Sequence, residues 1–156
     1  MAPCGHYPRS WTDALRVGDS RIGISNMETA DEVERFWRCE YAAAFHKKSP
    51  EDYADTFALP CIINVDDLPR TVFTDRDELI EFCTKLIRNA TDTSWNTSSI
   101  DAFSVSVLDE NVALVRVEAS RFDIDGKQIS RLYGSYTINK DGGRWKMAAV
   151  FGGFLR

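Results

Sequence analysis

The segment RLYGSYTINKDGGRWKM, residues 131–147, decides how this chain folds. Apolar and polar side chains alternate on both sides of Lys140-Asp-Gly-Gly143, and an Asp-Gly pair between two such runs is a strong hairpin signal. A second Asp-Gly pair ends the turn Asp123–Gly126, and the same alternation continues upstream of it. The two turns and the alternation around them predict an antiparallel meander of four strands over residues 95–108, 112–123, 127–139 and 144–154.

Three segments before the meander carry helix signals. Thr29-Ala-Asp-Glu32 has the form of a capping box, and apolar residues recur behind it at three-to-four spacing, which lays one apolar stripe along a helix. Ser49-Pro50-Glu51-Asp52 predicts the start of a second, short helix, because serine caps helices and proline suits the first helical position. Thr74-Asp-Arg-Asp77 predicts a third helix that ends near Asn89.

A short strand pair is predicted between the second and third helices. Leu59–Val65 is apolar and rich in β-branched residues, so we expect a strand there. Pro60 near its start indicates an edge strand or the entrance of a strand, because proline cannot donate to a sheet ladder. Asp66-Asp67-Leu68-Pro69 then predicts a turn, and residues 70–73 a short returning strand.

The composition is that of one soluble globular domain. The 156 residues are 44% hydrophobic and 28% charged, and we expect an irregular arm over residues 1–28 followed by one α+β domain over residues 29–156. The formal net charge of −5 argues against nucleic acid as a partner. No apolar run approaches the ~18 residues that span a membrane, and the arm lacks the apolar core of a secretory signal.

The four cysteines are far apart, without a Cys-x-x-Cys motif or a nearby histidine pair, so the sequence indicates no zinc site. No glycine-rich phosphate loop is present, and we expect no cofactor. Cys39, Cys61 and Cys83 each lie in an apolar segment, where a free thiol usually behaves as a small hydrophobic side chain. We therefore expect reduced thiols and a cytoplasmic location.

The order helix, helix, strand pair, helix and four antiparallel strands resembles the nuclear transport factor 2-like superfamily, also described as the cystatin-like fold. The resemblance runs from Thr29 to the C-terminus, and its most telling segments are Tyr41–Phe45, Tyr53–Phe57, Thr74–Leu79 and the hairpin of residues 131–147. It implies three N-terminal helices packed on a curved, mainly antiparallel sheet, with a conical pocket between the two layers. It also implies that the other face of the sheet often forms a homodimer.

Residues on both faces of the last predicted strand are apolar, which suits a dimer in which a second copy covers the outer face. Trp145 and Met147 share one parity, and Ala148 and Val150 share the other. The alternative is a central strand that its own chain covers on both sides.

Asp66 and Tyr41 are the candidate catalytic residues that the resemblance implies. Ketosteroid isomerases carry an aspartate general base at the end of the first strand, and a tyrosine of the first helix helps to bind the oxyanion. A carboxylate that faces a phenol in a dry pocket can move a proton next to a carbonyl. The second acid of such a site is missing, because residues 127–138 contain no Asp or Glu. Ordinary turn chemistry for Asp66 and a core position for Tyr41 are the alternatives.

Other chemistries of the superfamily fit this sequence less well. Scytalone dehydratase chemistry resembles a histidine pair with tyrosines, and the histidines here are His6 and His46, in the arm and at a helix end. Limonene epoxide hydrolase chemistry resembles an Asp-Arg-Asp set, and the strand over residues 144–154 has no carboxylate to complete one.

Several aromatic side chains of this sequence carry a hydroxyl or an indole N–H, and such side chains predict the lining of a pocket for a flat apolar ligand. Arg131 belongs to an otherwise apolar or small strand, where it would attract a ligand carboxylate if it points inward and would be a surface charge if it points outward. The predicted pocket residues are Trp37, Tyr53, Trp95, Arg131 and Tyr133.

Three functions stay open at this point. The first is binding of a small apolar or carbonyl-containing ligand in the cleft, without established catalysis. The second is an isomerase or lyase that uses Asp66 as general base and Tyr41 as oxyanion helper. The third is a non-catalytic association domain whose interior is filled by its own side chains. The first two functions need an open cavity, and the third needs a filled one.

Overall fold

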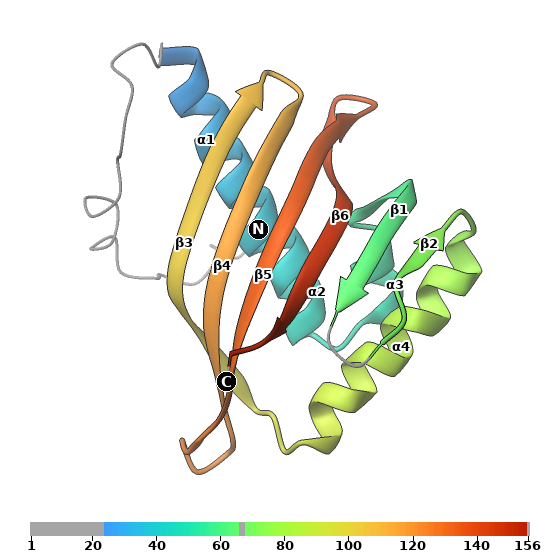
Figure 1. Ribbon diagram of the computed structural model, residues 1–156, viewed down its shortest axis with the longest axis vertical. Coiled ribbons are helices and arrows are strands. Elements are labelled where there is room, and N and C mark those ends of the chain that lie inside the picture. The colour runs from blue at the N-terminus through green and yellow to red at the C-terminus, as the bar shows by residue number, and fades with distance from the viewer. Residues whose placement is uncertain (1–23, 66–67, 156) are drawn as a thin grey trace.

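The computed structural model describes residues 24–65 and 68–155 and has the predicted α+β fold (Figure 1). The predicted irregular arm lies outside the described residues as far as position 23. Residues 24–28 of the predicted arm are helical, since the first helix begins at Ile24 and not at Thr29. Asp66 and Asp67 also lie outside the described residues.

The first three helical segments follow one another without a break. They are α1 (Ile24–Phe36), a π-helical stretch η1 (Trp37–Ala42) and α2 (Ala43–His46). The predicted capping box at Thr29–Glu32 is therefore wrong, since a helical turn already precedes it. Glu32 instead accepts a hydrogen bond from Nε1 of Trp145 at 3.0 Å and pairs with Lys140 at 3.4 Å, and both contacts lower its pKa. These bonds attach the helix to the last hairpin of the sheet.

Two further helices flank the strand pair, as predicted. They are α3 (Pro50–Ala54) and α4 (Arg76–Asp92). The side chain of Ser49 accepts from the backbone N–H of Asp52, and Asp75 accepts from the N–H groups of Asp77 and Glu78. Each cap satisfies backbone donors that the first helical turn leaves without an intrahelical partner.

The sheet has six strands in the order β2-β1-β6-β5-β4-β3. Neighbouring strands are antiparallel except β1 and β6, which run parallel, so the sheet is mainly antiparallel as predicted. The strands are β1 (Phe57–Val65), β2 (Thr71–Phe73), β3 (Thr97–Asp109), β4 (Val112–Phe122), β5 (Gln128–Asp141) and β6 (Arg144–Phe154).

Pro60 does not mark an edge strand. It lies in β1, between β2 and β6, where the register with β6 shifts between Phe57 and Ile62. An irregularity of this kind tolerates a residue that has no N–H to donate. The strands at the two edges of the described sheet are β2 and β3.

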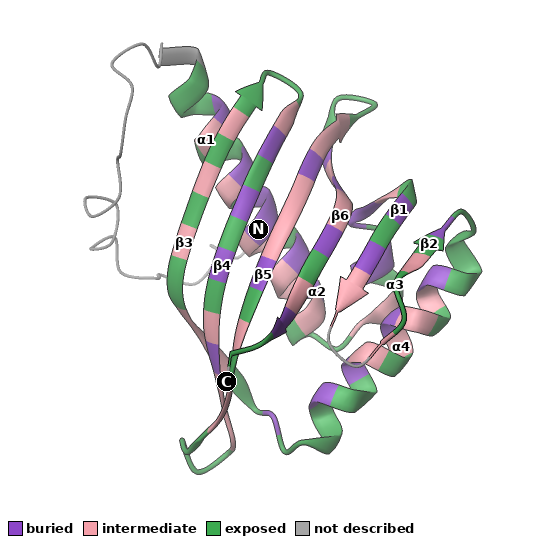
Figure 2. Cartoon of the chain, viewed as in Figure 1, coloured by how far each residue is buried: buried purple, intermediate pink, exposed green. Residues whose placement is uncertain are grey.

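The two faces of the sheet differ in what covers them. The inner face carries Val115, Ile138 and Met147, all fully buried, and α1 and α2 lie behind it in Figure 1. The outer face is turned away from these helices. Figure 2 shows the resulting alternation of buried and exposed residues along β4, as the period of two in the sequence predicts.

The cysteines are only partly as expected. Cys61 and Cys83 are free thiols in the core, and burial raises the pKa of Cys61 to about 11 and that of Cys83 to about 12. Cys39 is disulfide-bonded, so the expectation of a free thiol is wrong at this position. Among the described helices, none combines the length and the apolar character needed to cross a bilayer.

Candidate functional site

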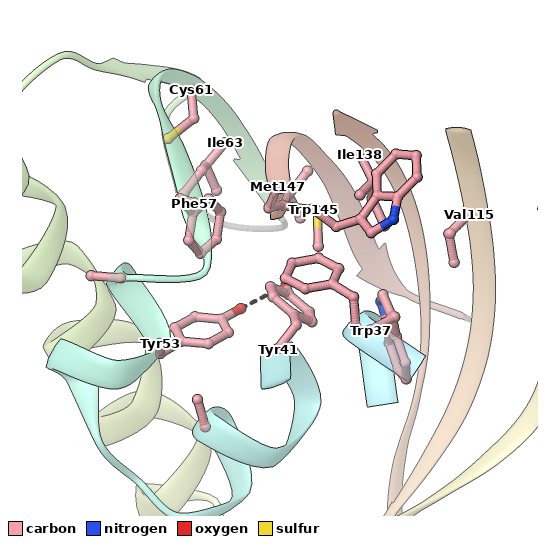
Figure 3. Packing of buried hydrophobic residues seen from close by; sticks show 14 of the residues in the cluster. Trp37, Tyr41, Tyr53, Phe57, Cys61, Ile63, Val115, Ile138, Trp145 and Met147 are labelled. Atoms are coloured by element: carbon pink, nitrogen blue, oxygen red, sulfur yellow. Dashed lines mark hydrogen bonds between the residues drawn. The ribbon is translucent and has the colours of Figure 1, made fainter. Parts of the chain in front are cut away.

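The interior between the helices and the inner face is occupied by aromatic rings in tilted and edge-on contacts, and part of this packing is drawn in Figure 3. The ring centroids of contacting pairs are 4.9 to 5.9 Å apart. Such spacing is that of close-packed aromatic pairs, which leaves no room for a ligand between them. This set, the aromatic cluster, consists of Trp37, Tyr41, Phe45, Tyr53, Phe57, Trp95, Phe103 and Tyr136.

Three of the predicted pocket residues belong to this cluster. Trp37 comes from η1, Tyr53 from α3 and Trp95 from the segment before β3, and all three are buried. Nε1 of Trp95 donates to Oγ of Ser98 at 2.9 Å, whereas the buried Nε1 of Trp37 makes no hydrogen bond within the described residues. These side chains therefore pack against one another in the core.

Tyr41 is held by other tyrosines. The hydroxyl of Tyr53 donates to the hydroxyl of Tyr41 at 2.6 Å, and Tyr136 shares a hydrogen bond with Tyr41 (Figure 3 shows the first bond). Burial raises the pKa of Tyr41 and of Tyr53 well above the ordinary value and that of Tyr136 to about 12. A hydroxyl that already has partners inside the core is poorly placed to polarise the carbonyl of a ligand.

Gly134 makes room for one of these tyrosines. A Cβ atom at position 134 would lie 2.3 Å from the hydroxyl oxygen of Tyr136, two residues further along the same face of β5. The ring of Tyr136 therefore lies over the backbone of Gly134, which keeps its hydroxyl within reach of Tyr41.

Arg131 and Tyr133 are not in the interior, contrary to the pocket prediction. Both lie on the outer face of β5, where Arg131 pairs with Glu118 at 3.5 Å and approaches Asp101 at 4.0 Å. Tyr133 is 44% exposed. Successive side chains of a strand point to opposite faces. Gly134 and Ile138 face the core, so the odd-numbered Arg131 and Tyr133 on the same strand point away from it.

Arg121 is an inward-facing residue that the sequence analysis missed. It lies on the inner face of β4 with its guanidinium carbon 5.7 Å from the ring centre of Phe45 and 5.5 Å from that of Trp95. Burial lowers its pKa. The signal was available, because Arg121 continues the alternation through Val115 and Val117 that marks the buried parity of this strand.

Two hollows on the surface lie apart from Tyr41. One, of about 320 Å³, is lined by residues that include Leu59, Leu79 and the ion-paired Asp55 and Arg76. The other, of about 340 Å³, lies where α1 meets the hairpin of β5 and β6 and is lined mainly by charged side chains. Within the described residues, no three His, Cys, Asp or Glu side chains form a group that could hold a metal ion.

Comparison with known families identifies the chain. A model described as NTF2-like protein (DUF6841) matches residues 31–153, which is most of the sequence. The chain belongs to this family. The resemblance predicted from the order of helices and strands is thereby confirmed. No curated protein matches the sequence.

Several solved structures share this fold at low sequence identity. A ketosteroid isomerase-like protein from Erwinia carotovora atroseptica SCRI1043 is 16% identical, with a TM-score of 0.65 over 83% of this chain and 98% of that one. An NTF2-like protein with a cystatin-like fold from Novosphingobium aromaticivorans is 12% identical, with a TM-score of 0.65 over 86% and 92%. The yeast UBP3-associated protein BRE5 is 14% identical, with a TM-score of 0.64 over 80% and 95%. These likenesses concern the fold alone.

Proposed function

We propose that this NTF2-like domain is a non-catalytic association domain that forms a homodimer through the outer face of its sheet. The observation that carries the proposal is a row of directly opposed residues that crosses all six strands on that face. The row runs from β2 to β3 through Val72, Ile62, Ala149, Thr137, Leu114 and Ser106.

Large apolar side chains of this outer face are exposed to solvent. In the row itself, Val72 is 58% exposed, Ile62 38% and Leu114 39%. On the same face, Phe151 is 41% exposed next to the row, and Tyr133 is 44% exposed further along β5. Soluble monomers rarely expose a contiguous apolar patch of this kind, and such a patch usually marks an interaction surface.

The charges around the row suit a second copy of the chain. Arg116 lies next to the row on β4 and makes no ion pair with any described residue, and Glu118 follows it on the same face. A two-fold contact presents one patch to itself, so both signs of charge must be available on one surface. Arg116 and Glu118 meet this requirement, because they place a cation and an anion next to each other on one face of β4.

The packed interior favours this function over the two alternatives from the sequence. Ligand binding and isomerase chemistry both need an open cavity, whereas the aromatic cluster fills the space beside Tyr41. Tyr41 as oxyanion helper would also have to give up its bonds to Tyr53 and Tyr136. BRE5, one of the proteins with this fold, is itself named for an association with another protein.

The mass of the protein in solution tests the proposal. We expect light scattering coupled to gel filtration to give the mass of two chains for the wild type. Leu114→Lys, which places a charge within the row, should give the mass of one chain with an unchanged circular dichroism spectrum. Ile124→Lys is the matched control, because Ile124 is 78% exposed in the turn between β4 and β5 and away from the row. A monomeric wild type, or a Leu114→Lys protein that stays dimeric, would overturn the proposal.

A further inference from the structure

We propose that Arg121, together with Phe45, Trp95 and Ser130, binds a small monocarboxylate with an apolar body at the end of the inner face near α2. This site is independent of the proposed dimer, because it lies on the opposite face of the sheet. Tyr41 is not among its residues.

The cation of this site is fixed in place and half-buried. Arg121 lies near the end of β4, where its guanidinium group faces the rings of Phe45 from α2 and Trp95 from the segment before β3, and these two rings contact each other with centroids 5.1 Å apart. The rings cover one side of the guanidinium group and offer no acceptors to its N–H donors.

No described carboxylate pairs with Arg121. The acidic partners of the other arginines lie elsewhere, such as Asp55 for Arg76 and Glu118 for Arg131. Burial lowers the pKa of Arg121, and only the hydroxyls of Tyr53 and Tyr136 act against this shift. A charge that has lost part of its hydration without gaining an anion is stabilised when an anion binds.

Neutral donors surround the guanidinium group. Ser98 and Ser130 lie directly opposite Arg121 on the two neighbouring strands, and such pairs point to the same face. The hydroxyl of Ser98 already accepts from Trp95, while the hydroxyl of Ser130 makes no hydrogen bond with another described residue and can donate. His46 contacts the ring of Trp95 with centroids 5.2 Å apart, and burial and the charge of Arg121 both lower its pKa. A neutral imidazole adds a donor without a second charge.

The arrangement selects the class of ligand. The planar fork of an arginine matches the two oxygens of a carboxylate. One half-buried cation balances one negative charge, and a phosphate dianion would bring a second charge for which the buried part of the site has no partner. Lys48, whose Nζ lies 5.8 Å from the ring centre of Trp95, is exposed and supplies only a distant attraction. The rings of Phe45 and Trp95 favour an apolar body next to the carboxylate.

Titration with benzoate, followed by the NMR signal of the Trp95 indole N–H, tests the site. We expect a saturable shift with the wild type, and at least a roughly tenfold weaker response with Arg121→Gln, because a charge-assisted bidentate bond is lost. Arg88→Gln is the matched control: it removes the same charge from an exposed position on α4, outside both the proposed dimer contact and this site, and should bind benzoate as the wild type does. Benzyl alcohol and inorganic phosphate should produce no saturable shift.

Each result decides the proposal. The absence of a saturable shift in the wild type overturns it, as does equal binding by Arg121→Gln. Equal weakening by Arg88→Gln also overturns it, since the response would then reflect the net charge of the protein. Arg121→Lys keeps the charge and provides a second test if the glutamine variant fails to fold: it should bind more weakly than the wild type, because an ammonium group cannot form the bidentate pair.

Discussion

At the scale of single residues, the interior of this domain is organised by hydroxyl groups inside an apolar layer. A buried tyrosine normally needs a partner for its hydroxyl, and here tyrosines serve one another. Tyr41 accepts from Tyr53 and bonds with Tyr136, so three elements of the fold meet at one oxygen atom. This arrangement accounts for tyrosine, and not phenylalanine, at these three positions.

Tyr53→Phe should lower the free energy of unfolding by about 1 to 2 kcal/mol, because the hydroxyl of Tyr41 loses its donor in a buried place. The measurement is urea unfolding at a fixed protein concentration. Tyr133→Phe removes the same atom from a residue that is 44% exposed, and should change stability by less than about 0.5 kcal/mol. Equal effects of the two substitutions would contradict a structural role for the Tyr41–Tyr53 bond.

The sequence could assign some site residues to a face of the sheet, but not all of them. Arg121 shares its parity with Val115 and Val117, so its inward direction could have been predicted from the alternation alone. Arg131 was named as a pocket residue, although the parity of Ile138 on the same strand points it outward. Parity is informative only after the register of the strand is fixed, because a slip of one residue reverses every side chain.

At the scale of elements, β5 shows how a strand accommodates a large side chain of its own. Gly134 leaves the space that the ring of Tyr136 occupies. The ring cannot easily move away, because it contacts Trp37 at 5.8 Å and Tyr41 at 5.4 Å between centroids. A methyl group at position 134 would therefore compete directly with this packing.

Gly134→Ala should destabilise the domain by about 1 to 3 kcal/mol, the usual range for overpacking a core. In a Tyr136→Leu background the same substitution should be less harmful, since the ring that it meets is gone. A double-mutant cycle from urea unfolding measures this coupling. If the two effects simply add, the close approach of Gly134 and Tyr136 does not limit stability.

The order of elements was the most predictable property of the chain. Asp-Gly pairs and a period of two identify the meander from β3 to β6, and helix caps mark the starts of α3 and α4. The beginning of α1 was missed, because Thr29–Glu32 imitates a capping box inside a helix that starts at Ile24. The central position of β1 was missed because its partner β6 lies more than eighty residues further along the chain, beyond the reach of local patterns.

At the scale of the whole molecule, the buried tyrosines and cysteines make stability depend on alkaline pH. Their pKa values are raised in the folded state, to about 12 for Tyr136 and about 11 for Cys61, whereas the unfolded chain ionises at the ordinary values, near 10 and 8.5. Between these values the unfolded state binds fewer protons than the folded state. Stability is therefore complete below about pH 8 and decreases as the pH rises towards the folded values.

The free energy of unfolding should therefore fall steadily between about pH 9 and about pH 11, and the tyrosinate absorbance of the buried rings should rise only as the protein unfolds. Urea unfolding at several pH values provides the measurement. Tyr136→Phe should show a shallower decrease, since one ionising group has been removed. A free energy that stays constant over this range would contradict the burial of these groups.

The parallel pairing of β1 with β6 has a consequence for the order in which the protein is made. The strands β3 to β6 are neighbours along the chain as well as in the sheet, so each can join the previous one as soon as it is available. By contrast, β1 and β2 have no place in the sheet until β6 exists, because β6 lies between β1 and β5. Closing such a long loop is slow compared with hairpin formation. During synthesis on the ribosome, the apolar strand β1 therefore waits without its main partner until the last strand has emerged.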